Sequence, residues 1–153
     1  MSELSTRRAT PADAGAVREL TRSAYAKWVP IVGREPRPMT ADYAAAVAEH
    51  VIDLFERDGT LVALIEMKPE ADHLLIVNIA VDPDCHGQGI GGRLLGHAER
   101  VASSQGLAEM RLYTNARMEA NIALYGRRGY HETGRADAGP LGTVVHMRKM
   151  LVA

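Results

Sequence analysis

Residues 74–95 read LLIVNIAVDPDCHGQGIGGRLL, and this stretch decides the expected fold. Its first part is an apolar run typical of a buried strand, and four glycines follow within positions 87–92. A helical pattern of apolar residues begins directly behind them. Glycine allows positive φ angles that let several backbone N–H groups converge on one spot, and a helix start adds unsatisfied donors. Strand, glycine turn and helix together predict a binding site for an anionic phosphate group.

The composition is that of an ordinary globular domain. The chain has 153 residues, of which 46% are hydrophobic and 24% charged, and its formal net charge is −1. This balance excludes a global basic field for nucleic acid. The one cysteine cannot form an internal disulfide, the N-terminus carries no apolar run, and the longest apolar runs are too short to span a bilayer. We therefore expect a cytoplasmic protein with no nucleic-acid or membrane partner.

Periodicity and turn signals predict one domain over residues 1–153. The expected strands lie at 4–9, 51–56, 61–67, 74–81, 110–114, 130–133 and 143–151. The expected helices lie at 10–29, at 40–49, from the glycine turn to about 105, and at 120–128. Three prolines and a glycine predict an irregular loop over 30–39. The order β-α-α-β-β-β-α-β-α-β-β indicates a mixed α/β fold with antiparallel hairpins.

The glycines also fit the dinucleotide-binding fingerprint G-x-G-x-x-G. That fingerprint requires the glycines to follow the strand directly and an acidic residue to end the next strand. Here residues 82–86 intervene, and the next strand ends in Tyr-Thr-Asn at 113–115 without a carboxylate. Dinucleotide binding is therefore a poor fit. A plain strand-to-helix turn leaves the glycines unexplained, because each of them costs backbone entropy.

Residues 86–91, His-Gly-Gln-Gly-Ile-Gly, resemble the acetyl-CoA signature of the GCN5-related N-acetyltransferase (GNAT) superfamily. That signature is Gln/Arg-x-x-Gly-x-Gly/Ala, so His86 departs from it at the first position. A second motif of the superfamily, Asn, then Leu-Tyr, then Gly-Phe/Tyr, matches Asn121, residues 124–125 and residues 129–130. Many members carry the asparagine seven residues before the tyrosine, where this chain has Met118. The similarity is that of a small, single-domain bacterial-type member.

The resemblance implies a largely antiparallel sheet of six to seven strands with helices on both faces. It also implies that the sheet splays between the strands at 74–81 and 110–114, and that the cosubstrate is acetyl-CoA with no metal. Small members often form homodimers, so a homodimer is one expected assembly. In the superfamily, the strand before the turn pairs with the pantetheine arm and the turn amides hold the pyrophosphate. The residues matched to cofactor binding are Ile79, Ala80, Val81, His86, Gly87, Gln88, Gly89, Ile90, Gly91, Gly92 and Asn121.

The chemistry implied is acetyl transfer to a primary amine by direct attack in a ternary complex. An amine with a pKa of about 10 is protonated at neutral pH, so a base or a water chain must remove a proton. Tyr125 matches the superfamily's general acid; the alternative is an aromatic packed beside Ile122. Glu66 is a carboxylate in an apolar strand and a candidate base; the alternative is a solvent-facing position. Asn78 either satisfies a bulge or lines the site.

The acceptor is expected to contact the segment 25–43, where members of the superfamily differ most. Its candidate substrate-binding residues are Tyr25, Trp28, Arg34 and Tyr43. Two arginines, Arg34 and Arg37, suit an acceptor that carries a carboxylate or phosphate, whereas Trp28 could instead pack in the core. A small-molecule amine is preferred over a protein N-terminus or lysine. The rival function is an acyl-CoA-binding sensor or interaction subunit with the same fold and no efficient turnover.

Overall fold

The computed structural model describes residues 3–151, and within them seven strands form one sheet. The strands are β1 Ser5–Arg8, β2 Val51–Arg57, β3 Thr60–Pro69, β4 Leu74–Val81, β5 Glu109–Asn115, β6 His131–Asp137 and β7 Thr143–Met150. Their order across the sheet is β1-β2-β3-β4-β5-β7-β6, and only β4 and β5 run parallel. The prediction of a mixed, largely antiparallel sheet is confirmed. No helix within 3–151 is long and apolar enough to cross a membrane.

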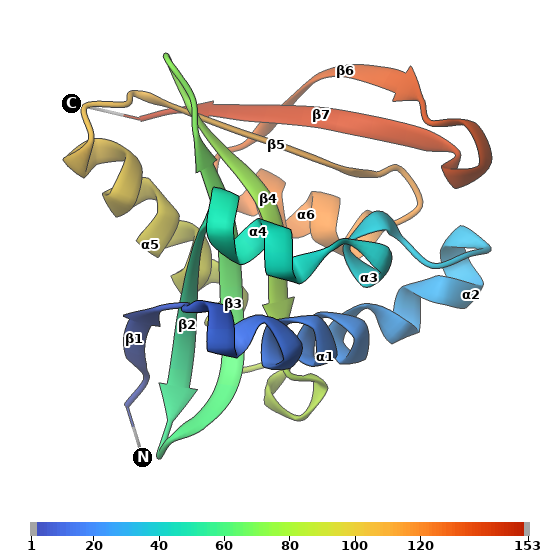
Figure 1. Ribbon diagram of the computed structural model, residues 1–153. Helices are drawn as coiled ribbons and strands as arrows, with labels where there is room; N and C mark the ends of the chain where they lie inside the picture. The colour runs from blue at the N-terminus through green and yellow to red at the C-terminus, as the bar shows by residue number, and fades with distance from the viewer. Residues whose placement is uncertain (1–2, 152–153) are drawn as a thin grey trace.

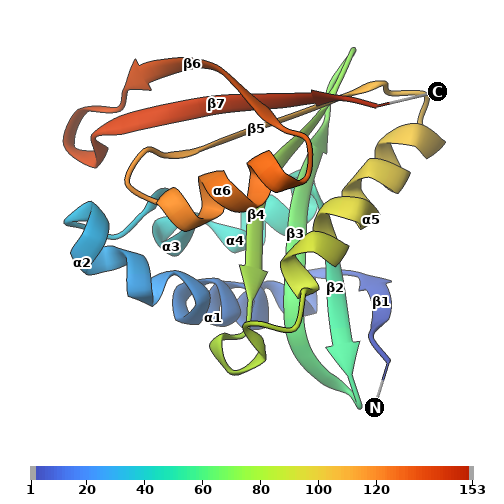
Figure 2. The same cartoon turned by 180° about the vertical axis from the view of Figure 1, so that it is seen from behind.

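Helices cover both faces of the sheet (Figures 1 and 2). They are α1 Ala14–Tyr25, α2 Val29–Val32, α3 Arg37–Thr40, α4 Tyr43–Glu49, α5 Ile90–Ser104 and α6 Glu119–Arg127. The first four lie on one face, and α5 and α6 lie on the other. Each face is apolar enough to hold its helices, because the buried side chains form separate clusters on the two sides of β3 and β4. The helix α5 alone contributes Leu94 and Leu95 at 0% exposure, each of which stabilises the fold by about 1.5–3 kcal/mol.

Two expectations about the segment before residue 40 are wrong. The first helix ends at Tyr25 instead of 29 and continues as a 3-10 turn, Ala26–Trp28. Pro30 explains the break, because it has no N–H to donate to the carbonyl of Ala26. The expected loop over 30–39 contains α2 and α3, each of which accommodates a proline in its first turn, where a missing N–H costs little. The strand expected at 130–133 is also longer, since β6 pairs with β7 as far as Asp137.

A β-bulge in β4 opens the sheet at its centre. Glu66 of β3 pairs with Asn78 and the next residue, Met67, pairs with Ile76, so Val77 is the extra residue. The bulge reverses the side-chain alternation: Leu74 and Ile76 belong to the core under α5, whereas Ala80 belongs to the core under α1 and α4. β5 pairs with β4 only from Leu74 to Ile76. Beyond that point the two strands separate, which confirms the expected splay.

Candidate active site

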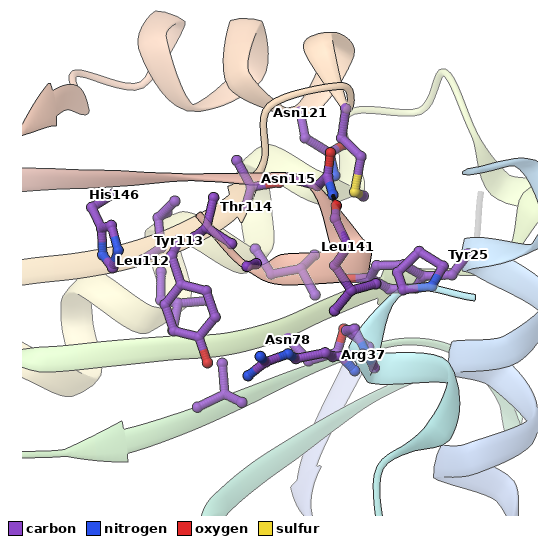
Figure 3. A pocket seen from close by; sticks show the side chains of 18 of the residues that line it. Tyr25, Arg37, Asn78, Leu112, Tyr113, Thr114, Asn115, Asn121, Leu141 and His146 are labelled. Atoms are coloured by element: carbon purple, nitrogen blue, oxygen red, sulfur yellow. Dashed lines mark hydrogen bonds between the residues drawn. The ribbon is translucent and has the colours of Figure 1, made fainter. Parts of the chain in front are cut away.

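Two cavities meet where β4 and β5 separate. The glycine-turn cavity, about 300 Å³, is lined by the turn at 86–91 and by Ile79 and Val81. The central cavity, about 330 Å³, is lined by residues 76–79 of β4, 112–115 of β5, 36–38 at the start of α3, and 136–138 at the end of β6 (Figure 3). Both cavities are lined by Tyr25, Ile79, Asn121 and Tyr125. These four residues form the junction of the two cavities.

The glycine turn presents unpaired backbone donors to its cavity. Gly87 and Gly89 have φ angles of 81° and 75°, which only glycine adopts without strain. The amide groups of residues 87–89 make no hydrogen bond to any residue within 3–151. The next three amides belong to the first turn of α5 and have no partner inside the helix. This turn therefore offers a row of N–H donors at a helix N-terminus, a combination that binds phosphate groups.

Of the remaining turn glycines, Gly91 serves packing. A Cβ at Gly91 would lie 3.3 Å from Leu124 Cδ2, so its absence lets α6 approach the start of α5 closely. A Cβ at Gly92 would be in ordinary contact, 3.7 Å from the guanidinium of Arg128. His86 Nε2 lies 3.2 Å from the Val81 carbonyl oxygen, so its ring folds back over the end of β4. Gln88 Oε1 accepts a hydrogen bond from Arg57 at 3.1 Å.

The end of β4 borders the junction with a free backbone edge. Its pairing with β5 stops at Ile76, so no strand covers the edge that faces β5 over residues 77–81, where the Ile79 backbone contacts the Tyr25 hydroxyl. Ile79 and Val81 line the glycine-turn cavity, whereas the side chain of Ala80 is buried on the opposite face, under α1. Of the three residues expected to contact the cofactor, Ala80 can therefore offer only its backbone.

Two tyrosines lie at the junction. Tyr125 of α6 is 8% exposed, and burial raises the pKa of its phenol to about 12. Its hydroxyl makes no hydrogen bond to any other residue of the described chain, so its proton is free to be donated. Burial also raises the pKa of the Tyr25 phenol well above its usual value, and the neighbouring Tyr125 adds to the rise. Both hydroxyls are therefore protonated at neutral pH.

A polar cluster lies beside the junction, on the face that α1 and α4 cover. Glu66 is 4% exposed and lies 2.6 Å, Oε2 to Nδ1, from His50, which precedes β2. Asn78 is the cross-strand partner of Glu66. A side cavity of about 260 Å³ is lined by Glu66, His50, Asn78, Arg37 and Tyr113, and the last three also line the central cavity. Glu66 is thus buried next to a cavity and does not face bulk solvent.

The hydrogen bonds of Asn78 fix the orientation of its amide. Its Nδ2 donates to Thr21 Oγ1 at 3.2 Å and to the Tyr43 hydroxyl at 3.3 Å. The Tyr43 hydroxyl gives its own proton to the Pro38 carbonyl at 2.6 Å, so towards Asn78 it can only accept. The amide oxygen of Asn78 is therefore the atom left over. It is buried without a hydrogen-bond partner within residues 3–151.

Of the four candidate acceptor residues, three line a cavity and one, Arg34, does not. Tyr25 lines both main cavities, and Tyr43 is buried and holds Asn78. Trp28 is 7% exposed and packs with Val32 and Met118, although it also borders the glycine-turn cavity. Arg34 lines none of these cavities.

Several residues of the central cavity were not singled out from the sequence. They are Met118 and, as Figure 3 shows, Tyr113, Leu141 and His146. Tyr113 had a detectable signal, since an aromatic on the solvent-facing side of an alternating strand requires a reason, and it is 42% exposed. Leu141 carried none, because it reaches the cavity only through the β6–β7 turn. Across residues 3–151, no three His, Cys, Asp or Glu side chains gather as a metal site would require.

Known proteins resemble this chain in sequence. The model of the acetyltransferase (GNAT) family matches residues 16–130. The ribosomal protein bS18-alanine N-acetyltransferase of Escherichia coli strain K12 is 36% identical over 76 residues, which are 50% of this chain and 51% of that protein. The IAA acetyltransferase of Azospirillum brasilense is 30% identical over 115 residues, 66% of this chain and 72% of that protein. The chain spans about half the length of the first curated relatives it matches.

Solved structures resemble it in fold. The PaiA N-acetyltransferase of Thermoplasma acidophilum, solved in complex with coenzyme A, aligns with a TM-score of 0.81 and 19% identity over 97% of this chain and 99% of that one. The ribosomal-protein-S18-alanine N-acetyltransferase of E. coli aligns with a TM-score of 0.79 and 24% identity over 98% and 96%. These likenesses agree with the open sheet described above. Since the family model also covers most of the sequence, this chain belongs to the GNAT acetyltransferase family.

Proposed function

We propose that this protein transfers an acetyl group from acetyl-CoA to the primary amine of a small molecule, by direct attack in a ternary complex. The observation that supports this most is the junction: the glycine-turn cavity and the central cavity meet at Tyr25, Ile79, Asn121 and Tyr125. Two ligands that enter from opposite sides would place their reacting ends against the same tyrosines. Proximity of this kind removes the entropic cost of a bimolecular encounter.

The glycine-turn side suits coenzyme A. The unpaired amides at 87–92 and the start of α5 would hold the pyrophosphate, because both supply N–H donors and positive potential. The open backbone edge of β4 would pair with the amide-containing arm as a further strand does. Asn121 has no hydrogen-bond partner for its side chain in the described part of the chain and borders both cavities, so its amide is available to the same arm.

In the reaction, a bond forms between the amine nitrogen and the acetyl carbon while the carbon–sulfur bond breaks. The acceptor ammonium has two protons to lose. Glu66, paired with His50, would take one and release it to solvent. The other would return to Tyr125, which gives its own proton to the sulfur. The side cavity links Glu66 to the central cavity through Asn78 and Tyr113.

Tyr125 would give the proton to the departing sulfur. Its pKa of about 12 lies above the thiol value of about 8.5, so a separate transfer would be uphill by roughly 5 kcal/mol. The donation must therefore be concerted with cleavage of the carbon–sulfur bond. The raised pKa also keeps the phenol protonated over the whole physiological range.

The acceptor cavity favours a small molecule. It is covered on one side by residues 36–38 and on the other by residues 138 and 141 of the β6–β7 turn. The relatives leave the acceptor open, because they are named for a ribosomal protein alanine, for mycothiol and, at 29% identity over 73 residues, for spermidine. A cytoplasmic location and a homodimer remain predictions.

The experiment is a thiol-release assay with acetyl-CoA over a panel of amines, amino acids, polyamines and peptides, with the products identified by mass spectrometry. We expect one class to be acetylated, with intersecting double-reciprocal plots that indicate a ternary complex and not the parallel lines of a ping-pong mechanism. Acetyl-CoA should also raise the melting temperature. If acetyl-CoA binds but no amine accelerates thiol release above hydrolysis, the protein is a sensor and this proposal is wrong.

A further inference from the structure

We propose that the acceptor is an amino acid with an apolar side chain, whose carboxylate is bound by Arg37. This inference rests on the proposed function and names the substrate class of the same site. Figure 3 shows Arg37 and Asn78 along one wall of the central cavity. Both also line the side cavity that contains Glu66.

The backbone that carries Arg37 is held firmly against the fold. Tyr43 donates to the Pro38 carbonyl at 2.6 Å, and Arg22 Nη1 donates to the Met39 carbonyl at 2.7 Å. Arg22 Nη2 also donates to Glu35 at 2.6 Å. Three hydrogen bonds therefore fix the short segment from which Arg37 projects into the cavity. A guanidinium placed in this way keeps a fixed position relative to the junction.

The guanidinium of Arg37 has no hydrogen bond or ion pair to any residue of the described chain. Arg22 pairs with Glu35, a carboxylate of the same segment. Three other carboxylates around the cavities have different partners: Glu66 contacts His50, Asp137 accepts from the amide of Gly139 at 2.7 Å, and Asp42 accepts from the amide of Ala45 at 3.2 Å. Glu49 lines the side cavity but forms no ion pair with Arg37. A planar guanidinium with all its donors free is suited to bind a carboxylate through two parallel hydrogen bonds. Arg37 is thus a ready carboxylate ligand at the rim of the cavity.

Asn78 forms the wall of the central cavity next to Arg37. Its side chain is held by hydrogen bonds to Thr21 and Tyr43, on the face of the sheet that α1 and α4 cover. Its amide oxygen is buried and unpaired within residues 3–151, with almost no exposed surface that a ligand could contact. Asn78 therefore shapes the cavity beside Arg37, and Arg37 is the residue to which the acceptor binds.

The rest of the cavity selects the side chain and excludes other amines. Most of its wall is apolar and includes Ile76, Leu112, Met118, Leu141 and Val144. An apolar side chain would be buried there, whereas a polyamine would bring a second ammonium towards the unpaired Arg37 and be repelled. A peptide N-terminus has an amide in place of the carboxylate and would leave the guanidinium unpaired.

The test uses matched pairs of acceptors with and without the carboxylate: phenylalanine with phenethylamine, and leucine with isopentylamine. For the unmodified protein we expect a higher kcat/KM for the amino acid of each pair. Arg37→Gln should lower kcat/KM for the amino acids about 10- to 100-fold, mainly through KM, and leave the decarboxylated amines nearly unchanged. Arg37→Lys should recover part of the loss, because lysine keeps the charge but not the planar fork. Arg18→Gln is the matched control, since Arg18 is an exposed arginine of α1 that lines none of the cavities.

Calorimetric titration of phenylalanine into the protein with coenzyme A adds a readout that does not depend on turnover. Arg37→Gln should abolish detectable binding of phenylalanine, while coenzyme A binds as before. The inference is overturned if decarboxylated amines are preferred, or if Arg37→Gln weakens both members of a pair equally. In either case acetyl transfer, and so the proposed function, still stands. If coenzyme A binds and no amine of any class is acetylated, the proposed function fails and this inference fails with it.

Discussion

At the glycine turn, the groups that face the cavity are backbone amides, whereas across the junction the cavity is faced by the side chains of Arg37, Asn78 and Tyr113. The first region is shaped by positive φ angles at Gly87 and Gly89 and by a helix N-terminus. The second depends on a short segment held to the sheet by hydrogen bonds. Backbone amides suit a group that does not vary, such as the pyrophosphate of the proposed cosubstrate. A side-chain site can change its acceptor by single substitutions without losing the donor.

Tyr125 borders both regions, and its removal should have the largest effect. Tyr125→Phe removes the hydroxyl and keeps the ring that packs against Tyr130 at 6.2 Å. We expect kcat to fall about 100-fold or more, as for other general acids, while the dissociation constant for acetyl-CoA and the melting temperature stay nearly unchanged. Single-turnover kinetics with calorimetry would measure both. An unchanged kcat would show that solvent, and not Tyr125, protonates the sulfur.

The pH dependence of kcat is a second test of the role of Tyr125. Because its pKa is raised to about 12, the phenol loses its proton only at strongly alkaline pH. The titration of Tyr125 should therefore cause no fall in kcat below about pH 10. Below that pH, the kcat profiles of the unmodified protein and of Tyr125→Phe should have the same shape. A fall in kcat at pH 8–9 that the variant removes would contradict the burial of this hydroxyl.

The backbone region should be broken by a side chain at a glycine with positive φ. Gly89 precedes the start of α5 and has φ 75°, and no atom lies within 4 Å of the position that a Cβ would take there, so the conformation and not a clash forbids substitution. A β-branched residue is strained in this conformation by about 1–2 kcal/mol, and its side chain would project from the turn. Gly89→Val should weaken coenzyme A binding about 10- to 100-fold with no change in acceptor preference, as calorimetric titration would measure. Gly106→Val is the matched control for general destabilisation, because Gly106 has φ 73°, no atom lies within 4 Å of its Cβ position, and it lines none of the cavities.

The sequence was sufficient to predict the backbone region because glycine spacing specifies backbone conformation directly. The strand, the turn and α5 could be assigned within a few residues, and the helix expected at 120–128 matches α6. The splay of β4 from β5 followed from the resemblance to the family. The bulge at Val77 that accompanies the splay is not visible in the apolar run, because every residue near it except Asn78 is apolar.

The side-chain region could not be predicted in the same way, since its contacts join distant parts of the chain. Asn78 depends on Thr21 and Tyr43, which are 57 and 35 positions away. Arg34 and Arg37 are equivalent as residue types, and only the one-turn helix α3, which the sequence did not suggest, turns Arg37 towards the cavity. Tertiary placement, not residue type, therefore decides which arginine faces the central cavity.

The contacts that join β1, β2 and α5, the helix behind the glycine turn, should contribute less to the stability of the fold in acid. Asp53 of β2 is 5% exposed and lies 2.7 Å from His97 Nε2 of α5 and 2.6 Å from Arg8 Nε of β1. Burial by itself would raise the pKa of this carboxyl, but the hydrogen bonds from His97 and Arg8 outweigh it and hold the pKa below its usual value. A depressed folded pKa gives stability that is present above the unfolded value of about 3.9 and is lost as the pH falls through the folded value.

Asp53→Asn should therefore lower the free energy of unfolding by about 2 kcal/mol at neutral pH. Because the variant lacks the titrating carboxyl, the difference from the unmodified protein should shrink as the pH is lowered below about 4. Urea unfolding at a series of pH values measures this. A difference that is constant with pH would mean that Asp53 contributes through packing and not through its charge.

Tyr43→Phe should give the smallest effect and sharpen the contrast most, because it loosens only the side-chain region. The variant loses the hydrogen bond to the Pro38 carbonyl and one of the two that orient Asn78. A hydrogen bond of this kind contributes about 1 kcal/mol, so we expect KM for the acceptor to rise about fivefold. The dissociation constant for coenzyme A should not change, because no atom of Tyr43 borders the glycine-turn cavity. If both constants rise together, the two regions are coupled through β4, and the separation of donor and acceptor recognition is wrong.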